Sequence, residues 1–266
     1  MRRLFLFAAY MPDGKLHASL EYYLKALKAC GDVVLVADSD LDEAAVSMLG
    51  KHCIGVQAVR HGEYDFGSYK RAYAWAGERL SGYDVVYLVN DSVFGPLRDL
   101  EPVLQRMEAL PYEAFCMVMN PHRKSPHMQS WFVGLRREVA SSAWFADFLG
   151  GVRKLESKAD ICIVYETGLT GLMEAHGVRC GGLFEIKGRR IYNAPAAVYA
   201  AGVPFLKKSS FVRHGGSLGA QIKKVMDKVP QEAAQAVLAD VDPTLLSASP
   251  LKMAVRYLSY LWRKMR

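Results

Sequence analysis

A carboxylate stands directly after one of the strands that the sequence predicts. Val85 to Val89 is a run of five apolar residues, and Asn90-Asp91-Ser92 follows it. An acidic side chain at the carboxyl end of a buried strand suits Mg²⁺ or Mn²⁺, hard ions that favour oxygen ligands. Such an ion could neutralise a diphosphate leaving group. Asn, Asp and Ser also favour turns, so the tripeptide alone allows a second interpretation in which Asp91 caps a turn.

A second polar and aromatic group, residues 61–70, follows another predicted strand. Its aromatic rings can stack on a base or sugar, its carboxylate can bind hydroxyl groups, and its cation can bind phosphate. The alternative is structural, with Asp65 and Ser68 starting a helix and the aromatic rings packing in a core. A third group precedes a later strand and, taken alone, is more typical of a loop: His127, Gln129 and Ser130.

Alternating strands and helices are expected to position these groups. Apolar runs predict strands at 3–10, 33–37, 55–59, 85–89 and 114–119. Helical spacing predicts helices between them at 16–30, 41–49, 68–80 and 100–110, the second of them capped by Asp38-Ser39-Asp40. This alternation indicates an α/β fold of the Rossmann type, a mostly parallel sheet with helices on both faces. Ligands of such sheets bind outside the carboxyl ends of the strands, where two of the three groups lie.

The second half of the chain is less regular. We expect a strand at 129–135 and helices at 137–149 and 161–176. Residues 178–216 are rich in Gly, Pro and aromatic residues, which predicts loops and short strands.

Composition and absent motifs exclude several classes of protein. The 266 residues are 51% hydrophobic and 23% charged, which is ordinary for a globular protein and argues against disorder. The chain has no GxGxxG, no P-loop and no GxSxG motif, and this disfavours dinucleotide oxidoreductases, P-loop kinases and α/β-hydrolases. Five scattered cysteines give no zinc spacing and are typical of the cytoplasm. No apolar run reaches the length of a membrane span, and the short run in residues 4–10 predicts a strand rather than a secretory signal.

The net charge of +7 is concentrated at the end of the chain. Residues 251–266 carry five bases and no acid, whereas the remainder is close to neutral, and this disfavours nucleic-acid binding. The five bases are Lys252, Arg256, Arg263, Lys264 and Arg266. Lys252, Arg256, Ser259, Arg263 and Arg266 would form a polar stripe on a helix whose other faces carry Leu, Val, Tyr and Trp. This pattern favours a helix lying on an anionic membrane surface, and the alternative is a helix packed on protein.

Several motifs in register resemble one known family. They are His61 followed by Tyr64-Asp65-Phe66-Gly67-Ser68-Tyr69-Lys70, then Tyr83-Asp84, Leu88 to Leu97, His127 to Phe132, Glu166 with Leu169-Thr170, and Pro204 to Lys207. Together, over roughly residues 1–210, they resemble the rhamnan synthesis protein F family. The resemblance implies a glycosyltransferase of the A-type fold that builds cell-surface polysaccharide such as the O-antigen of lipopolysaccharide. The donor would be a nucleoside-diphosphate sugar such as dTDP-rhamnose, and the acceptor a glycan or a lipid-linked glycan.

The resemblance, together with the strand-end rule, implies where the donor binds. Ala9 and Tyr10 would flank the base, Tyr64 and Asp65 the base or ribose, and Lys70 or Arg71 the phosphates. Asp91 would face the diphosphate, directly or through a divalent cation (Mg²⁺ or Mn²⁺). Further substrate-binding residues are expected from the same motifs: Ser68, Asn90, Ser92, Gln129, Ser130 and Lys207. The chain departs from the family pattern at Met117-Val118-Met119-Asn120-Pro121 and at Trp131, and Asn90 replaces the first carboxylate of the DxD motif.

Glu166 is the predicted acceptor base. It lies between Ile161-Cys162-Ile163-Val164-Tyr165 and Thr167-Gly168-Leu169-Thr170, and partial burial there would raise its pKa toward that of a working base. The family resemblance implies an inverting transfer, which needs such a base opposite the leaving group. The alternative is a structural Glu166 held by Arg179 or Arg213, in which case His127 becomes the candidate base.

These expectations define a glycosyltransferase domain at 1–216 and a helical tail at 217–266. Residues 1–121 would bind the nucleotide sugar and residues 122–216 the acceptor. We expect a cytoplasmic protein, peripheral on the inner face of the plasma membrane through residues 251–266. The competing function is a non-catalytic module that binds carbohydrate or nucleotide within a polysaccharide assembly complex.

Overall fold

The computed structural model describes residues 1–122, 125–246 and 250–264, which form two compact units. The first unit comprises Met1–Leu16, Leu24–Asp91 and Leu100–Glu185, and the second His17–Tyr23, Ser92–Asp99 and Ile186–Arg266. The boundary expected at residue 216 therefore lies inside the second unit.

The first unit is built on one mixed sheet. Its strands are β1 (Arg3–Ala9), β2 (Asp32–Ala37), β3 (Gly55–Ala58), β4 (Val85–Asn90), β6 (Ala114–Asn120), β7 (His127–Met128), β8 (Phe132–Arg136) and β9 (Cys180–Glu185). They are ordered β3-β2-β1-β4-β8-β6-β7, and β9 pairs with β6. Strands β1, β2, β3 and β4 pair in parallel, as do β6 and β9, whereas β8 runs antiparallel to both β4 and β6. Six strands thus point the same way, which confirms the mostly parallel α/β fold.

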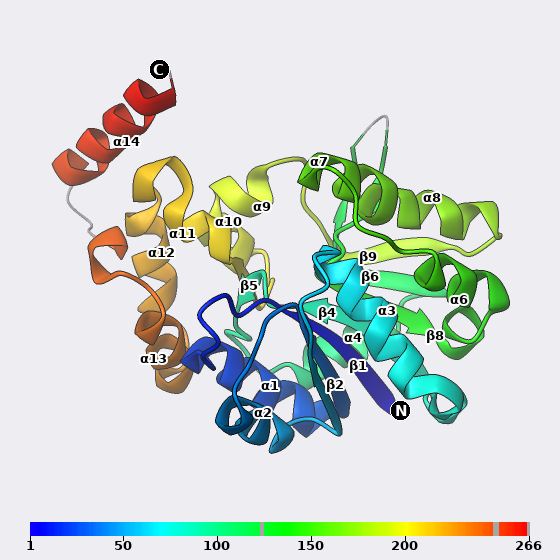
Figure 1. Cartoon of the computed structure of the whole chain (residues 1–266). Coiled ribbons are helices and arrows are strands. Elements are labelled where there is room, and N and C mark those ends of the chain that lie inside the picture. Colours follow the sequence, from blue (N-terminus) through cyan, green and yellow to red (C-terminus); the bar gives the residue numbers. More distant parts are fainter. Residues whose placement is uncertain (123–124, 247–249, 265–266) are drawn as a thin grey trace. The chain divides into compact units, whose positions relative to one another are not determined.

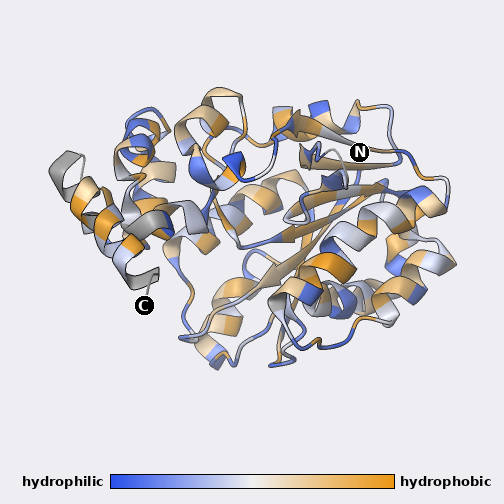
Figure 2. Ribbon diagram, turned by 90° about the horizontal axis from the view of Figure 1, so that it is seen from above, coloured by the Kyte–Doolittle hydropathy of each residue, from blue (hydrophilic) through white to orange (hydrophobic). Residues whose placement is uncertain are grey.

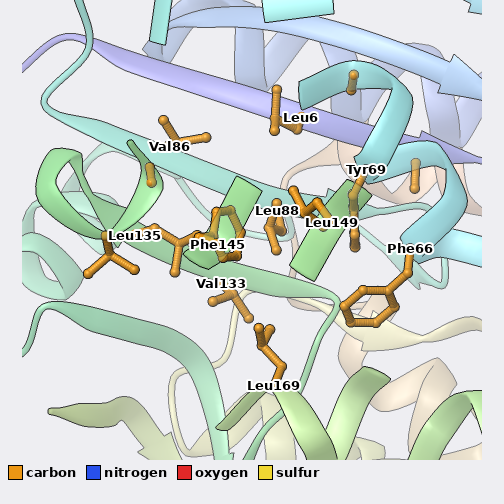
Figure 3. Close-up of a cluster of buried hydrophobic side chains, with 14 of the residues drawn as sticks. Leu6, Phe66, Tyr69, Val86, Leu88, Val133, Leu135, Phe145, Leu149 and Leu169 are labelled. Carbon is orange, nitrogen blue, oxygen red and sulfur yellow. The ribbon is translucent and has the colours of Figure 1, made fainter. Parts of the chain in front are cut away.

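Helices cover both faces of this sheet (Figure 1). Those that lie wholly in the first unit are α2 (Glu43–Gly50), α3 (Tyr64–Ala76), α4 (Glu101–Glu108), α5 (Arg137–Ala140), α6 (Ala143–Gly150), α7 (Lys158–Ile161) and α8 (Gly168–Ala175), with the 3-10 turn η1 (Gly77–Gly82). On one face Phe66 and Tyr69 of α3, Phe145 of α6 and Leu169 of α8 pack on Leu6, Leu88 and Val133 of the sheet (Figure 3). The strands are coloured mostly as hydrophobic in Figure 2, as expected for a sheet buried on both sides.

The other face is closed by α4 through a buried ionic network. The Arg3 guanidinium donates to the Glu108 carboxylate at 2.6 Å and to Glu101 at 2.5 Å, and the Tyr87 hydroxyl donates to Glu108 at 2.8 Å. Arg3 and Glu108 are 6% and 7% exposed. The bonds to Glu108 raise the pKa of Arg3, and burial raises the pKa of Tyr87. This network lies at the amino end of β1.

Two helix starts in the first half differ from the prediction. Asp42, rather than Asp38 to Asp40, caps α2, and its carboxylate accepts from Ala45 N at 2.7 Å. Helix α3 begins at Tyr64, four residues before the predicted start, and ends at Ala76, where η1 follows. Phe66 and Tyr69 lie three residues apart and are both buried, so the apolar face of the helix extends back beyond the predicted start.

Three elements of the second half differ from the prediction. The strand expected at 129–135 begins only at Phe132, as β8, and the short β7 precedes it. The helix at 137–149 is α5 and α6, separated where Ser142 caps α6 by accepting from Phe145 N. The helix at 161–176 is α7, a π-helical segment η2 (Cys162–Thr167) and α8. A single π-helical turn cannot be recognised from the spacing of apolar residues, because it barely shifts their 3.6-residue period.

Residues 178–216, expected to form loops and short strands, contain the strands β9 and β10 and also several helices. Strand β9 has glycine at two successive positions because there is no room for a side chain. A Cβ at Gly181 would lie 2.1 Å from the Tyr112 ring, and one at Gly182 would lie 2.6 Å from Met119 Cβ. Glycine disfavours strands by propensity, so tertiary packing conceals this strand from a sequence reading.

The second unit is mainly helical. It contains β5 (Val93–Phe94), paired antiparallel with β10 (Leu206–Lys207), and α9 (Arg190–Asn193), α10 (Pro195–Ala200), α11 (Lys208–Val212), η3 (Arg213–Gly216), α12 (Gly219–Met226), α13 (Gln231–Ala239), η4 (Pro243–Leu246) and α14 (Pro250–Lys264). Helix α1 (Ala18–Cys30) contributes to both units. In the described ranges no helix combines the length and hydropathy that a membrane span requires.

Candidate functional site

The parallel strands of the first unit deliver polar side chains to one edge. Strand β4 ends at Asn90, and Asp91 follows it. Asp91 N donates to Ala8 O at 3.2 Å, and the Asp91 carboxylate accepts from Tyr10 N at 3.4 Å. Asp91 is half-buried and is tied to the end of β1. The strand-end position predicted for this carboxylate is therefore present.

A second carboxylate reaches the same edge from helix α3. The Asn90 amide donates to the Asp65 carboxylate at 2.8 Å, which joins the first turn of α3 to the end of β4. Asn90 is buried and Asp65 half-buried. Asp65 is thus joined to the residue that precedes Asp91 in the chain. Asn90 acts here as a bridge, which a carboxylate at this position could not do while Asp65 is ionised.

Two exposed tyrosines lie beside these acids in the chain. Tyr10 is 59% exposed and follows β1, and Tyr64 is 45% exposed and begins α3. Tyr64 has a φ of 56°, a left-handed conformation that a bulky residue rarely adopts. Exposed aromatic rings are suited to stacking on a base or sugar. Ala9, the neighbour of Tyr10, is buried in β1 and can offer only its backbone.

The loop that presents Tyr64 and Asp65 is fixed by Asp38 and His61. The Asp38 carboxylate accepts from His61 N at 2.8 Å and from Gly62 N at 3.1 Å. The buried His61 ring accepts from Glu63 N through Nδ1 at 3.1 Å, so the neutral ring donates from Nε2 to Ser68 Oγ at 3.0 Å. Burial lowers the pKa of His61. These bonds make His61 and Ser68 supports of the loop, and they occupy the hydroxyl that was expected to meet substrate.

Gly67 lets this loop close upon α3. A Cβ at Gly67 would lie 2.3 Å from Glu63 Cβ and 2.7 Å from His61 Nδ1. The expected phosphate cations are used nearby in other contacts. Lys70 Nζ donates to Val152 O at 2.8 Å, and Arg71 pairs with Glu63 and donates to Gly67 O at 2.9 Å. Most of the 61–70 motif is therefore scaffold for Tyr64 and Asp65.

Strands β6 and β7 bring a histidine to the same edge. His127 starts β7 opposite Asn120, the last residue of β6. His127 Nδ1 donates to Ser125 O at 2.9 Å, which leaves Nε2 as the acceptor, 3.4 Å from Asn120 Nδ2. Gln129 is 5% exposed, and its Oε1 has no hydrogen-bond partner in the described part of the chain. Ser130 is also buried, and its carbonyl accepts from the Tyr69 hydroxyl at 3.2 Å.

Glu166 lies on the π-helical segment η2, which contacts β7. Thr170, one turn further on, accepts from Met128 N at 3.0 Å and anchors this region to the strand. Glu166 is half-buried, but the apolar run before it is not a buried segment, since Ile163 and Val164 are 66% and 48% exposed. Within the described ranges no hydrogen bond or ion pair engages the Glu166 carboxylate.

Both arginines that were expected to hold a structural Glu166, Arg179 and Arg213, make other contacts. Arg179 pairs with Glu113 and lowers the pKa of that carboxyl to about 2. Arg213 belongs to the second unit and lies over the Tyr192 ring. Ser92 and Lys207, which were expected to bind substrate, also lie in the second unit. There Lys207 Nζ donates to Ser92 Oγ at 2.8 Å.

In the described part of the chain, the acidic side chains of the first unit do not form a metal site by themselves. No cluster of three His, Cys, Asp or Glu side chains with metal-binding geometry occurs among the residues described. Mg²⁺ is commonly held by one or two carboxylates together with substrate phosphates. The Asp91 carboxylate, which accepts from Tyr10 N at 3.4 Å, is of the residue type used in that mode of binding.

Three residues at this edge were missed by sequence reasoning. Asp38 follows β2 as Asp91 follows β4, but it was interpreted as a helix cap. Asn120 ends β6, and Arg60 is a 61% exposed cation just past β3 that pairs with Asp40. The strand-end rule, applied to every predicted strand, would have found all three.

Comparisons with known proteins find one family and several solved structures that resemble the chain. The family model described as rhamnan synthesis protein F matches residues 33–252. No curated protein matches the chain. A solved structure described as a nucleotide-diphospho-sugar transferase from Desulfovibrio desulfuricans G20 is 18% identical, with a TM-score of 0.44 over 91% of this chain and 100% of that one. Core-mannan synthase A from Aspergillus fumigatus, in a Mn/GDP form, is 8% identical, with a TM-score of 0.32 over 56% of this chain and 63% of that one. Both structural likenesses are too distant to transfer an activity.

Proposed function

Because the chain belongs to the rhamnan synthesis protein F family, we propose that it is a glycosyltransferase of polysaccharide biosynthesis, with an A-type fold. It would move a deoxyhexose, rhamnose first among the candidates, from a nucleoside diphosphate to a glycan or lipid-linked glycan. The observation that carries this proposal is the carboxyl edge of the first unit's sheet, where Asn90 binds Asp65, Asp91 accepts from Tyr10 N, and Tyr10 and Tyr64 are exposed.

The donor's nucleoside is proposed to lie against Tyr10 and Tyr64. Aromatic faces stack on a base, and the Asp65 carboxylate can accept from ribose hydroxyl groups. Asp91 would face the diphosphate through a divalent cation held jointly with the phosphate oxygens. Such an ion supplies charge neutralisation for the leaving group. Arg60 replaces Lys70 and Arg71 as the cation proposed for the phosphates, because the latter two side chains are held within the scaffold.

Glu166 is proposed as the base that takes the proton of the acceptor hydroxyl. Its segment contacts β7, the strand that begins at the carboxyl edge with His127. A half-buried carboxylate that no described side chain neutralises can accept a proton as the hydroxyl attacks. His127 Nε2, Gln129 and Ser130 are proposed to hold the sugar or the acceptor. Attack opposite the leaving group would invert the anomeric centre.

Turnover of a panel of nucleotide sugars, including dTDP-rhamnose, tests this function. Purified protein is incubated with each donor and candidate acceptors, and released nucleoside diphosphate is measured with and without EDTA. We expect Glu166→Gln to lower turnover by at least ~10²-fold with unchanged nucleotide affinity, the usual scale for a general base. The matched control is Glu156→Gln, an exposed acid in the same half of the chain, with turnover like the parent.

Two outcomes would contradict parts of this proposal. Nucleotide binding without release for any donor and acceptor pair would favour the non-catalytic binding module. Full turnover by a folded Glu166→Gln protein would reject this base and direct attention to His127.

The C-terminal helix is proposed to hold the protein on the inner face of the plasma membrane. Helix α14 exposes Val255, Leu258 and Trp262 by 55%, 63% and 54%, at the spacing of one helical face. The side chains of Lys252, Arg256 and Arg263, and the whole of Arg266, on which the basic stripe depends, lie outside the described residues. Apolar and aromatic side chains beside basic ones suit an anionic interface.

Co-sedimentation with vesicles containing phosphatidylglycerol tests this location. We expect the full chain to sediment and a chain ending at Ser249 to remain in solution. Trp262→Ser should give an intermediate fraction, and Met48→Ser, at an exposed apolar residue of α2, is the matched control. Equal sedimentation of the full and shortened chains would overturn the proposal.

A further inference from the structure

Positive charge is concentrated in the second unit of the chain. This unit has 15 basic and six acidic side chains, whereas the first has 19 basic and 21 acidic ones. Residues 186–226 alone carry eight bases and no acid, so the charge is not confined to the C-terminal helix. A charge excess of this size attracts anionic surfaces.

Three of these bases belong to one tight turn, residues 187–190, here called the basic turn. Arg190 N donates to Lys187 O at 3.4 Å, and Gly188 has a φ of 61°, the left-handed conformation that glycine adopts without strain. Lys187, Arg189 and Arg190 are all exposed. The turn therefore presents two guanidinium groups and one ammonium to solvent together, where helix α9 begins.

Exposed apolar side chains accompany the basic turn on connected elements of the same unit. Helix α9 contacts α11, α11 contacts η3, and η3 contacts α14. Val212, the last residue of α11, is 62% exposed, and Leu258 and Trp262 of α14 are 63% and 54% exposed. A soluble polyanion such as a nucleic acid binds chiefly to the bases, whereas the interface of an anionic bilayer accommodates bases and apolar side chains alike. The combination therefore favours a lipid surface.

We propose that the basic turn is a second contact of the protein with an anionic membrane surface, in addition to α14. This contact extends the membrane location proposed above, because an apolar helix and a cluster of bases on other elements of the unit together limit its orientation on the bilayer. Exposed bases respond to the surface potential of the membrane rather than to one headgroup, so any anionic lipid should serve. The contact does not depend on glycosyl transfer.

Binding of the full chain to vesicles of phosphatidylcholine and phosphatidylglycerol tests the contact. The basic-turn variant combines Lys187→Gln, Arg189→Gln and Arg190→Gln. We expect it to bind these vesicles roughly 10²-fold more weakly than the parent, since each base near an anionic surface contributes about fivefold. The difference should shrink as salt is added, because salt screens exposed charges. A variant with Arg189→Lys and Arg190→Lys keeps the charge and should bind like the parent.

The matched control removes the same charge from exposed bases spread over the first unit. It combines Lys51→Gln, Arg79→Gln and Arg153→Gln. Its affinity for the anionic vesicles should stay within a few-fold of the parent, and circular dichroism checks the folding of both triple variants. Equal weakening in the control would overturn the proposal, because binding would then follow net charge alone. Parental affinity of a folded basic-turn variant would overturn it as well.

Two further measurements separate this contact from α14 and from another kind of partner. Trp262→Ser should weaken binding to vesicles of phosphatidylcholine alone, whereas the basic-turn variant should not, because its bases act only on anionic lipid. Loss of anionic-vesicle binding in the basic-turn variant but not in Trp262→Ser would support the turn and reject α14 as an anchor. Loss only in Trp262→Ser would overturn the turn and leave α14. If the basic-turn variant loses heparin binding but keeps its affinity for anionic vesicles, the partner is a soluble polyanion and the lipid contact is overturned.

Discussion

Strand β4 has an aspartate just before its start and another just after its end, and the two stand in different surroundings. Asp84 accepts from Arg2 N at 2.9 Å and from the Arg137 guanidinium at 2.5 Å, and the backbone bond lowers its pKa. At the opposite edge Asp91 accepts from Tyr10 N at 3.4 Å, and its neighbour Asn90 bonds Asp65.

The contrast extends along both edges of the sheet. At the amino edge Arg3 joins Glu101 and Glu108, so acids are matched with guanidinium groups in short, partly buried contacts. At the carboxyl edge Asp38 and Asp65 bond backbone or side-chain amides, and Tyr10 and Tyr64 are exposed. The first edge is built from ion pairs within the fold, whereas the second, where we propose that the ligand binds, holds its carboxylates by amide donors. The difference between the two edges thus lies in which donors surround the same acidic residue types.

The largest effect is expected when the negative charge of the aspartate after β4 is removed, in comparison with the aspartate before it. Asp91→Asn should reduce turnover by about 10²- to 10³-fold, because it removes charge stabilisation at the leaving group. Asp84→Asn should leave turnover within a few-fold of the parent. Nucleoside diphosphate release, with circular dichroism as a folding control, measures both. Similar turnover in the two variants would remove the functional distinction between the edges.

Loss of the buried acid at the amino edge should act on stability instead. Glu108→Gln should lower the free energy of unfolding by about 3 kcal/mol, because Arg3 would stay buried with a weakened partner. Glu101→Gln, at a partner that is 40% exposed, should cost at most about 1 kcal/mol. Urea denaturation measures both values. A Glu108→Gln protein as stable as the parent would show that the network contributes little to the fold.

A methyl group at Gly67 should disturb the carboxyl edge by sterics alone. Gly67→Ala would press on Glu63 Cβ and His61 Nδ1 and should cost about 2 kcal/mol of stability, with weaker nucleotide binding as Tyr64 and Asp65 shift. Gly50→Ala is the control, since a Cβ there would meet nothing within 4 Å. Nucleotide titration and urea denaturation check the pair, and parental behaviour of Gly67→Ala would mean that the loop yields easily.

The smallest effect is a pH dependence at the carboxyl edge. Burial lowers the pKa of His61 in the folded protein, whereas an unfolded chain has the ordinary value of about 6.5. The unfolded chain therefore binds the proton more readily, and stability should fall as the pH drops below about 6.5 toward the folded pKa. Unfolding free energies of the parent and His61→Gln between pH 7.5 and 5 measure this. An identical pH slope in both proteins would assign the dependence to other groups.

How far sequence reasoning reached depended on the range of the interactions involved. The strands that end at Ala9 and Asn90, and the placement of Asp91 beyond the second, were predicted because apolar runs are local patterns. The helix expected at 161–176 is present as α7, η2 and α8, but its π-helical turn leaves no local pattern. The position of β9 within residues 178–216 was not predicted, because contacts such as that of Gly181 with Tyr112 are not local. Family motifs marked residues 61–70 as a candidate site, but they could not separate the residues that face outward from those that support the loop.

The sequence by itself determined the α/β class, the alternation of the first strands and helices along the chain, and the family, since periodicity and motif spacing are written in consecutive residues. Only the tertiary structure decided what each polar residue does. Asp38, interpreted as a helix cap, holds the loop at His61, and Lys70, expected at phosphate, donates to Val152 O. The charge of the second unit likewise emerges only when distant segments are grouped by their contacts. Hydrogen bonds and burial join residues far apart in the chain, and no local pattern records which partner a side chain will find.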